Sequence, residues 1–436
     1  MMLTAAAGLA AAAPGGRDPH QFGDGGVSDF YRWNAALPAR PGVMLREQNL
    51  PLEPLLADAS RALRILYSST DGMRERGRIV VSGALYLPKG EPPAGGWPIV
   101  AWAHGTVGIA DVCAPSWGGN APDRQRYMDA WLKQGYAVVA SDYQGLGTPG
   151  PHPYLIPEPE GYGTLDAVRA VLAAHPKLLA NRVIATGQSQ GSGAALAAGL
   201  LAPTYAPELD YRGTVAMGLV PKLRDAGGAD QLPLPETWNY DDTEEAAFAT
   251  LYLLGTVRAL HPEIDPDQYI SAAGQPVKQA ALQGCFHAAI DAAAAHGVNM
   301  RTLYRTSVAA LEDEAGKRSE FPSPRLSTPV MTVTGLKDVL AEPAQQYNLV
   351  SGMCHAGSAV QWQLYPGETH ASAVNASLRD SIPFVARLFA GERPQGNCAA
   401  LKPDVWAEAS RRNSTDAPDR HAPDKSPPSP TQETAS

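Results

Sequence analysis

A serine between two glycines, in the segment Gly-Gln-Ser-Gln-Gly at residues 187–191, constrains the fold of this chain more than any other feature. Residues 182–186 before it are largely apolar and β-branched, which predicts a short buried strand. Residues 192–199 after it are small, which predicts a buried helix. The turn between them must be sharp, and a Cβ at either glycine would collide with the neighbouring strand or helix. The segment therefore predicts a tight strand-turn-helix unit that raises the Ser189 hydroxyl above a sheet.

Such a unit is typical of the nucleophile elbow of α/β-hydrolases, in which the serine attacks a carbonyl group. Ser189 is therefore the candidate nucleophile. The same turn would aim the backbone N–H of Gln190 and the helix N-terminus at the point where an oxyanion develops. A Gly-rich turn with an ordinary surface serine is the alternative, but the flanking strand and helix favour the nucleophile.

Strand patterns alternate with helix patterns along most of the chain. Beside the elbow strand, strands are expected at 78–88, 97–103, 136–143, 214–219, 328–335 and 360–365, and helices at 123–133, 166–174 and within 370–390. This alternation predicts a mostly parallel sheet covered by helices on both faces. The expected fold class is α/β, with an α/β-hydrolase fold.

Residues 220–327 interrupt the alternation, because they contain no convincing strand. Helices are expected at 242–260 and 277–296, and Gly255 weakens the first of them as an unbroken helix. We interpret this insert as a helical cap that walls an apolar acyl pocket, with Phe248 and Leu251 as candidate substrate-binding residues. The alternative is that the apolar face of this helix only packs on the core.

An activated serine needs a base, and the base needs an acid that orients it; in α/β-hydrolases these follow in the order serine, acid, histidine. Asp338 lies just past the strand at 328–335, and His370 lies between the last strand and the closing helix. We expect them to complete a triad with Ser189. Weaker candidates for the acid and base are Glu342, Asp380 and His355.

The loop after strand 97–103 is where the second oxyanion donor of such a site belongs. Its sequence is His104-Gly105-Thr106, and we expect the Thr106 backbone N–H to act together with that of Gln190. His104 is expected to brace this loop. Asp142 precedes the serine in the chain, so it is interpreted as a loop brace and not as the catalytic acid.

Composition excludes other classes of protein and site. The formal net charge of −9, without a basic run, argues against a nucleic-acid partner. The cysteines show neither C-x-x-C spacing nor histidines at zinc-ligand spacing, so no metal site is expected. Their even number predicts two disulfides in an exported protein, with four free thiols as the alternative. They are Cys113, Cys285, Cys354 and Cys398.

The two ends of the chain differ in composition from its middle. Residues 1–20 begin with an Ala-rich apolar stretch that resembles the end of a secretory signal but lacks a charged start, and a floppy Ala-rich segment is the alternative. Residues 413–436 are rich in Pro, Ser and Asp, which predicts a disordered tail. We therefore expect a catalytic domain at 21–412, with the 220–327 cap inserted in it.

Taken together, the chain resembles the secretory lipase family, namely the fungal-type lipase A group and its bacterial relatives. The resemblance covers about residues 50–398, and rests on the segments at 103–108, 141–147 and 165–170, the Gln-flanked elbow, the helical insert and the Asp338 and His370 loops. It implies a serine hydrolase for carboxylic esters with a helical lid and no cofactor. It also implies pairing of Cys113 with Cys285 and of Cys354 with Cys398. One departure is Ser192, where relatives often have glycine; we expect little consequence.

The expected function is a secreted carboxylesterase or lipase that acts on small-molecule or lipid esters, with medium to long acyl chains favoured and transient contact with a lipid surface. An acyltransferase or a peptidase would use the same apparatus. A peptidase would need carboxylates in the cap to hold the substrate amine, and the acidic segment at 241–245 is a candidate, although it fits the first turn of a helix better. A non-catalytic binding protein is disfavoured by the complete, correctly ordered triad. The sequence does not set the oligomeric state.

Overall fold

A computed structural model describes residues 26–73, 77–226, 228–234, 242–321 and 325–415. The expected signal remnant at 1–20, Asp241 of the acidic segment and residues 416–436 of the predicted tail lie outside these ranges.

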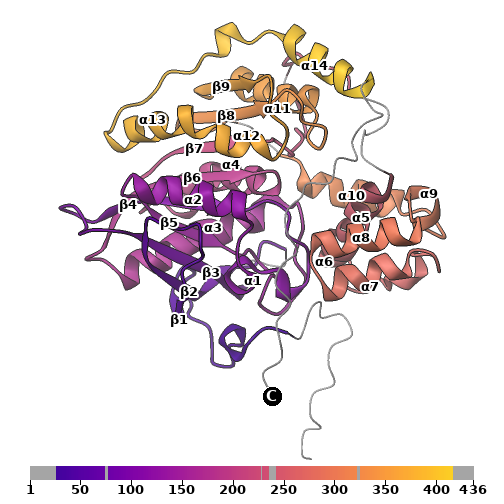
Figure 1. The fold of residues 1–436 in the computed structure, drawn as a ribbon, viewed down its shortest axis with the longest axis horizontal. Helices are drawn as coiled ribbons and strands as arrows, with labels where there is room; N and C mark the ends of the chain where they lie inside the picture. Colours follow the sequence, from indigo (N-terminus) through magenta and orange to yellow (C-terminus); the bar gives the residue numbers. More distant parts are fainter. Residues whose placement is uncertain (1–25, 74–76, 227, 235–241, 322–324, 416–436) are drawn as a thin grey trace, which may run out of the picture.

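The centre of the molecule is a mixed sheet, and within the described ranges it has nine strands in the order β1-β2-β3-β5-β4-β6-β7-β8-β9 (Figure 1). The first three strands pair antiparallel and β3 pairs antiparallel with β5, whereas β5, β4, β6, β7, β8 and β9 are parallel. Their bounds are β1 (Met44–Leu50), β2 (Ala59–Thr70), β3 (Arg78–Pro88), β4 (Trp97–Ala103), β5 (Ala137–Ser141), β6 (Leu179–Gln188), β7 (Tyr211–Met217), β8 (Val330–Gly335) and β9 (Val360–Tyr365). The mostly parallel sheet of the predicted fold class is confirmed.

Helices cover both faces of this sheet. Helices α3, α4 and α11 pack on one face and α2, α12 and α13 on the other. Several begin with proline at the first helical position, where its missing N–H costs nothing. The bounds are α1 (Pro115–Gly118), α2 (Pro122–Lys133), α3 (Pro157–Ala174), α4 (Gln190–Tyr205), α11 (Pro343–His355), α12 (Ser372–Ala376), α13 (Leu378–Phe389) and α14 (Pro403–Thr415), with short 3₁₀ turns η1 (Asp29–Tyr31), η2 (Asp111–Cys113) and η5 (Cys398–Ala400).

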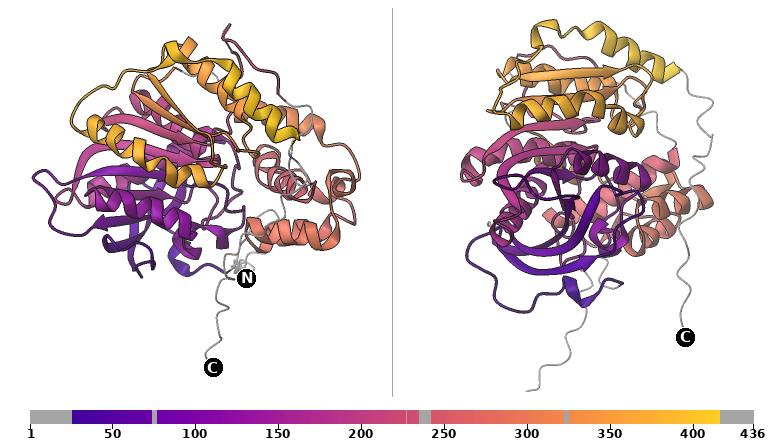
Figure 2. Two further views of the ribbon diagram at one scale, coloured as in Figure 1. Left: turned by 45° about the horizontal axis from the view of Figure 1, so that its top comes forward. Right: turned by 60° about the vertical axis from the view of Figure 1, so that its left-hand side comes forward.

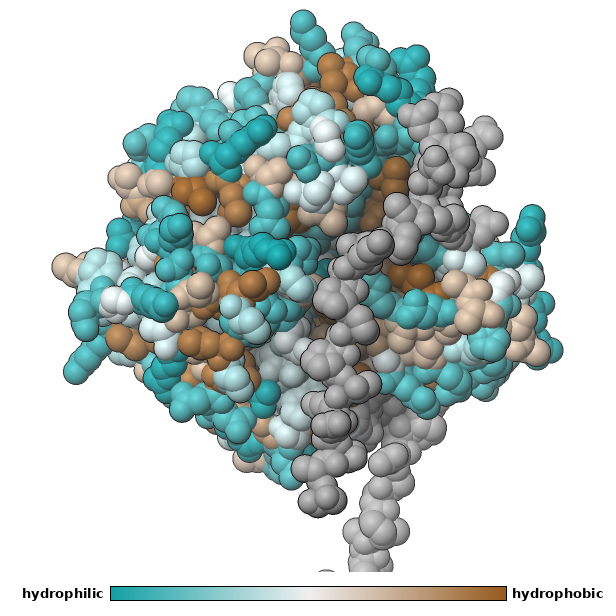
Figure 3. Space-filling view, viewed as in Figure 1, coloured by the Kyte–Doolittle hydropathy of each residue, from teal (hydrophilic) through white to brown (hydrophobic). Residues whose placement is uncertain are grey.

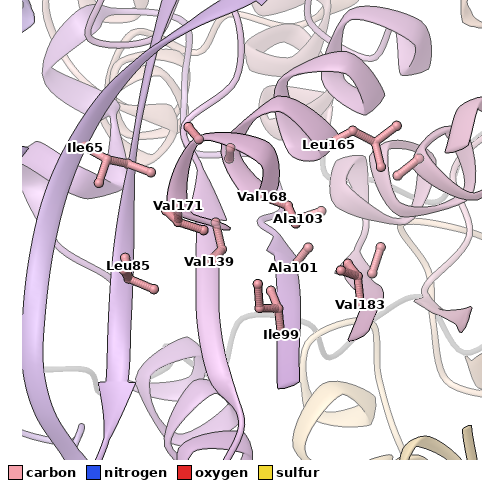
Figure 4. Close-up of a cluster of buried hydrophobic side chains, with 14 of the residues drawn as sticks. Ile65, Leu85, Ile99, Ala101, Ala103, Val139, Leu165, Val168, Val171 and Val183 are labelled. Atoms are coloured by element: carbon pink, nitrogen blue, oxygen red, sulfur yellow. The ribbon is translucent and has the colours of Figure 1, made fainter. Parts of the chain in front are cut away.

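The core between α3 and the sheet is built from aliphatic side chains that alternate inward along the strands. Ile99 and Ala101 of β4 and Val139 of β5 face Val168 and Val171 of α3, and all five are buried (Figure 4). Parallel strands covered on both faces need such nearly continuous apolar runs, which is why β4, β5 and β6 could be recognised from the sequence.

The segment between β7 and β8 is helical and stands beside the sheet as a separate group (Figures 1 and 2). Its described residues contain two isolated β-bridges and no longer strand. The elements are α5 (Asp242–Tyr252), the π-helical turn η3 (Leu253–Val257), α6 (Arg258–Leu260), η4 (Pro266–Gln268), α7 (Gln275–Gln283), α8 (Phe286–His296), α9 (Met300–Leu303) and α10 (Ala309–Ser319). We call residues 220–327 the insert.

Two close contacts fix where the insert meets the sheet region. A Cβ on Gly255 would lie 2.7 Å from the His152 carbonyl oxygen and 3.1 Å from Tyr154 Cβ, so only glycine lets the π-helical turn approach this loop. The Phe286 N–H donates to the Val107 carbonyl at 2.9 Å, directly after the loop that carries Thr106.

The structure contains the disulfides Cys113–Cys285 and Cys354–Cys398, with Cα–Cα distances of 5.3 and 5.6 Å. These are the pairs that the family resemblance implies. The first joins η2 to the insert, and the second joins the end of α11 to η5.

Two local predictions were wrong, and two strands were not predicted. The helix expected at 277–296 is broken into α7 and α8, because Gly284 is extended and Cys285 is held by its disulfide. Strands β1 and β2 were missed. Helix α14 continues to Thr415, so the first residues of the tail predicted to be disordered are helical; its Trp406 is fully buried.

The surface facing the viewer in Figure 3 is mostly hydrophilic, and its apolar side chains form small separated groups. In the described part of the chain, no helix combines the length and apolar character that crossing a membrane requires.

Candidate active site

Ser189 lies in the sharp turn between β6 and α4 and has φ 57° and ψ −124°. A positive φ is unfavourable for a residue with a side chain, and such strain is concentrated at functional sites. The turn is held by close backbone packing: a Cβ on Gly187 would lie 1.9 Å from the Gly191 carbonyl oxygen, and a Cβ on Gly191 would lie 2.0 Å from that of Ala103. Both glycines are therefore required by space, as an elbow demands.

Asp338 and His370 are brought together by the loops that follow β8 and β9. His370 Nδ1 lies 2.8 Å from Asp338 Oδ2, which also accepts a bond from Gln346 Nε2 at 2.9 Å. The other oxygen, Oδ1, accepts the backbone N–H groups of Leu340 and Ala341 at 2.9 and 2.8 Å. These four contacts supply partners to both oxygens of a fully buried carboxyl. They also fix its direction, so that it orients the imidazole.

His370 lies at the same end of the sheet as Ser189. The Ser189 N–H donates to the Met217 carbonyl at 2.9 Å, and a Cβ on the next residue, Gly218, would lie 2.8 Å from His370 Cε1. His370 Nε2 is buried and has no hydrogen-bond partner in the described ranges. A nitrogen in this state can accept a proton from a hydroxyl beside it.

The weaker acid and base candidates lie in other surroundings. Asp380 accepts a bond from the Tyr365 hydroxyl at 2.5 Å and pairs with Arg379. Glu342 is buried at the N-cap of α11. His355 is exposed at the end of α11. It precedes β9 and therefore lies at the opposite end of the strands from the site.

The candidate oxyanion donors belong to two segments that approach each other at Ser189. A Cβ on Gly105 would lie 3.4 Å from Ser189 Cβ, so the loop that carries Thr106 passes close to the serine. Gln190 is the first residue of α4, where backbone N–H groups lack partners within the helix. The Thr106 hydroxyl is bonded to that of Tyr154 at 2.9 Å, which holds the loop in place.

His104 and Asp142 sit in bracing positions. Burial lowers the pKa of His104 from 6.5 to about 3, so its ring is neutral, and its Nδ1–H donates to the Gly105 carbonyl at 2.8 Å. The buried Asp142 accepts the Ser82 hydroxyl at 2.6 Å and both the N–H, at 2.9 Å, and the hydroxyl of Ser116. It therefore ties the start of α1 to the sheet.

Several polar residues around the site were missed by sequence reasoning. Gln346 holds Asp338, as described above, and Asn413 of α14 donates to the backbone carbonyl of Asp338 at 3.0 Å. His152 and Glu160 both contact the side chain of Gln190, at 2.8 and 2.7 Å. No motif marks these positions, because each acts through a partner distant in sequence. Ser192, noted as a departure, accepts the Val220 N–H at 3.3 Å and so links α4 to the insert.

A cavity of about 390 Å³ opens beside Gln190, between α3, α4 and the insert. It is lined on the sheet side by Leu155, Pro157, Glu160, Gln190 and Gly193, and on the insert side by Val220, Pro221, Lys222, Tyr252, Glu312, Asp313, Gly316, Ser319 and Glu320. Leu251 is fully buried among the insert helices and Phe248 packs against Phe286, with ring centroids 4.5 Å apart. Neither of these candidate substrate-binding residues lines this cavity.

The comparisons with known proteins point to lipases. The model of the secretory lipase family matches residues 125–229, which include the elbow. Lipase 6 of Candida albicans is 29% identical over 198 residues, covering 42% of this chain and 41% of that protein. Lipase A of Moesziomyces aphidis is 22% identical over 389 residues, covering 84% of this chain and 80% of that protein.

Solved structures share the fold at low sequence identity. Candida antarctica lipase A in its closed state has a TM-score of 0.66 at 19% identity, with 88% of this chain and 94% of that chain covered. LipA, a rice cell wall degrading esterase from Xanthomonas oryzae, has a TM-score of 0.61 at 20% identity, with 82% and 100% covered. The solved structures confirm the α/β-hydrolase fold. The family model and the two lipases confirm the predicted resemblance to the secretory lipases, which indicates a carboxylic ester hydrolase.

Proposed function

We propose that the protein is a secreted carboxylesterase or lipase that hydrolyses carboxylic esters through Ser189, His370 and Asp338. The observation that carries the proposal is the buried contact of 2.8 Å between His370 Nδ1 and Asp338 Oδ2, at the same end of the sheet as a serine held at positive φ. The remaining ring nitrogen, Nε2, is left without a partner in the described residues, as a general base requires.

The geometry supports a two-step acyl transfer. The Ser189 hydroxyl attacks the ester carbonyl carbon while its proton passes to His370 Nε2, and the carbonyl electron pair moves onto oxygen. The N–H groups of Thr106 and Gln190 receive this oxyanion. Its collapse expels the alcohol, which takes the proton from His370. Water then attacks the acyl-enzyme by the same route, and the acid leaves.

The insert is proposed as a cap that sets the acyl-chain preference. Its attachment through Cys113–Cys285 and through the Phe286 N–H places it against the loop that carries Thr106. Leu155, Val220 and Tyr252 give the adjoining cavity apolar walls, and each methylene that such walls bury contributes about 0.8 kcal/mol. We therefore propose medium to long acyl chains, presented as small molecules or at a lipid surface.

Secretion is supported by the two disulfides, which persist in oxidising compartments, and by the relationship to secretory lipases. The compartment outside the cytoplasm, extracellular or periplasmic, follows from the same proposal.

A peptidase is the second candidate, and one observation favours it. Glu312, Asp313 and Glu320 of the insert line the cavity and are placed to hold a substrate amine. Lys222 lines the same cavity and would oppose that amine. An aminoacyl p-nitroanilide separates this activity from ester hydrolysis.

The test is Ser189→Ala, assayed with p-nitrophenyl esters from acetate to palmitate and with a triglyceride emulsion. We expect turnover to fall by roughly 10³-fold or more, because members of such a unit fail together. Ser192→Ala is the matched control, a buried serine on the same helix that lies outside the proposed chemistry. A serine-directed phosphonate should label Ser189. Near-normal turnover of Ser189→Ala would overturn the mechanism.

A further inference from the structure

The side chain of Gln190 is held from two sides by residues that play no part in the proposed chemistry. Its Nε2 lies 2.8 Å from His152 Nε2 and 2.7 Å from Glu160 Oε1, and all three residues are buried. His152 comes from the loop between β5 and α3, and Glu160 from the first turn of α3. The backbone N–H of this same Gln190 is one of the two proposed oxyanion donors.

The hydrogen positions on the histidine side follow from its partners. His152 Nδ1 lies 2.9 Å from the Gln144 carbonyl oxygen, which can only accept, so Nδ1 carries the hydrogen. Nε2 is then free to accept one N–H of the Gln190 amide. Burial lowers the pKa of His152 from 6.5 to about 4, which agrees with a neutral ring. The second N–H of the amide goes to Glu160 Oε1.

Two oxygens of this group remain without partners. Gln190 Oε1 and Glu160 Oε2 are both buried, and neither has a hydrogen-bond partner in the described part of the chain. If Glu160 were a carboxylate, Gln190 Oε1 and Glu160 Oε2 could both only accept hydrogen bonds, and no donor would be present between these two contacting residues. One proton on Glu160 Oε2 supplies the missing donor, with Gln190 Oε1 as the acceptor on the neighbouring side chain.

We infer that Glu160 is a positioning residue that acts as an uncharged carboxylic acid, holding the Gln190 side chain and thereby the first turn of α4 at the oxyanion site. The inference rests on the proposed role of the Gln190 N–H. This positioning role requires an uncharged Glu160 side chain. A full negative charge beside the developing oxyanion would raise the energy of the transition state that the site stabilises.

The surroundings of Glu160 favour the neutral acid. Burial raises its pKa well above the usual range, and in the described residues it has no ion pair. The Leu155 backbone N–H and the N-termini of α3 and α4 favour the charged form, but they are weak against the cost of a buried, unpaired carboxylate. The titratable groups around it are His152, Tyr143 and Tyr154 from the β5–α3 loop, together with Lys222, Tyr252, Glu312, Asp313 and Glu320 of the insert, which line the same cavity.

The first experiment compares Glu160→Ala, Glu160→Gln, Gln190→Ala and the double variant Glu160→Ala/Gln190→Ala. Glu160→Ala should lower kcat by roughly ten-fold with little change in KM, since an oxyanion donor is displaced but not removed. Glu160→Gln keeps an acceptor for the Gln190 amide and a donor for its oxygen, so it should restore kcat. In the Gln190→Ala background, Glu160→Ala should have little further effect. Glu158→Gln makes the same change two residues earlier on α3, at a partly exposed side chain, and should match the unmodified protein.

Two further readouts separate positioning from folding. The rate of inactivation by a phosphonate should fall with kcat in Glu160→Ala, because that reaction also builds negative charge on an oxygen at the same site. Infrared difference spectra of the unmodified protein and Glu160→Gln near neutral pH should show the loss of a protonated-carboxyl band. In Glu160→Gln, any decline of kcat at alkaline pH that comes from ionisation of Glu160 should disappear.

The inference is overturned if Glu160→Gln is as impaired as Glu160→Ala, if the two alanine substitutions are additive, or if the infrared difference shows a carboxylate. A failure of the proposed function has another signature, which is activity retained in Ser189→Ala. If Ser189→Ala loses activity while the effects of Glu160→Ala and Gln190→Ala are fully additive, the role of Glu160 is disproved and the proposed function stands.

Discussion

The hydrophobic cores of the sheet region and of the insert contain different kinds of side chain. The core between α2 and the sheet contains the large buried aromatic side chains Trp102, Tyr127 and Trp131. The buried hydrophobic side chains in the described residues between α5 and α10 of the insert are alanine, leucine, valine and isoleucine. All the proposed catalytic residues lie on the sheet region, and the insert supplies part of a cavity wall. Under the proposed function, we expect the chemistry to depend on the sheet region and the substrate preference to depend on the insert.

Among the substitutions that test whether the chemistry depends on the sheet region, the largest loss of activity is expected at Asp338. Asp338→Asn keeps the shape of the side chain but can present an N–H to His370 Nδ1, which favours the wrong tautomer of the imidazole. We expect kcat to fall by roughly 10⁴-fold, with urea unfolding reported alongside to separate a loss of fold.

Glu342→Gln is the matched control, because Glu342 is also a buried carboxyl near the start of α11. It should retain activity. Full activity in Asp338→Asn with loss in Glu342→Gln would move the acid to Glu342.

The attachment of the insert is tested by removing its disulfide. Cys113→Ser/Cys285→Ser opens a link between residues 172 apart and should lower the free energy of unfolding by about 2–4 kcal/mol. It should also increase hydrogen exchange and proteolysis within the insert.

The paired variant Cys354→Ser/Cys398→Ser opens a link between residues 44 apart on the sheet side. It should lower stability by a somewhat smaller amount without changing the acyl-chain profile. If both pairs alter the profile equally, the insert is not a separately anchored element.

We expect the loss of stability at acid pH to arise in the sheet region. Burial lowers the pKa of His104 from 6.5 to about 3, so between these values the unfolded chain binds a proton that the folded chain does not, and stability falls as pH falls. From about pH 7 to about pH 5 this group should cost the folded state about 2 kcal/mol. Urea unfolding should show that His104→Gln loses less stability over this range than the unmodified protein.

His296, exposed at the end of α8, provides the comparison in the insert. His296→Gln should keep the pH dependence of the unmodified protein. An identical pH dependence in His104→Gln would contradict a neutral, buried His104.

The smallest effect is expected in the cavity wall. Tyr252→Ala enlarges the cavity beside Gln190, and it should change kcat/KM for long-chain esters relative to acetate by roughly three- to ten-fold, since a methylene is worth about 0.8 kcal/mol. Phe248→Ala, on the same helix but outside this cavity, tests whether the pocket extends further into the insert. A profile that neither substitution moves would place the acyl pocket elsewhere.

The sequence predicted best the elements whose pattern is local. The runs in β4 and β5 are nearly continuous and apolar, and β6 leads into the motif of the elbow, so these elements could be located. Strand β9 is marked by the alternation of apolar and polar residues along it. Strand β2 was missed because its Ala, Arg and Leu residues do not favour a strand, and its pairing with β1 and β3 decides its conformation. The partners of Asp338 and Gln190 were missed for a related reason. Gln346, Asn413, His152 and Glu160 gain their roles from contacts across the fold, which leave no trace in a single sequence.

Gly255 limits how inserts can be exchanged between related proteins to alter their substrate range. Its π-helical turn rests on the backbone of His152, and the side chain of His152 holds Gln190. A transplanted insert with any larger residue at this position would press on the loop beneath the oxyanion site. Cutting at residues 220 and 327 is therefore not enough for a functional chimera, and the 144–156 loop should be exchanged together with the insert.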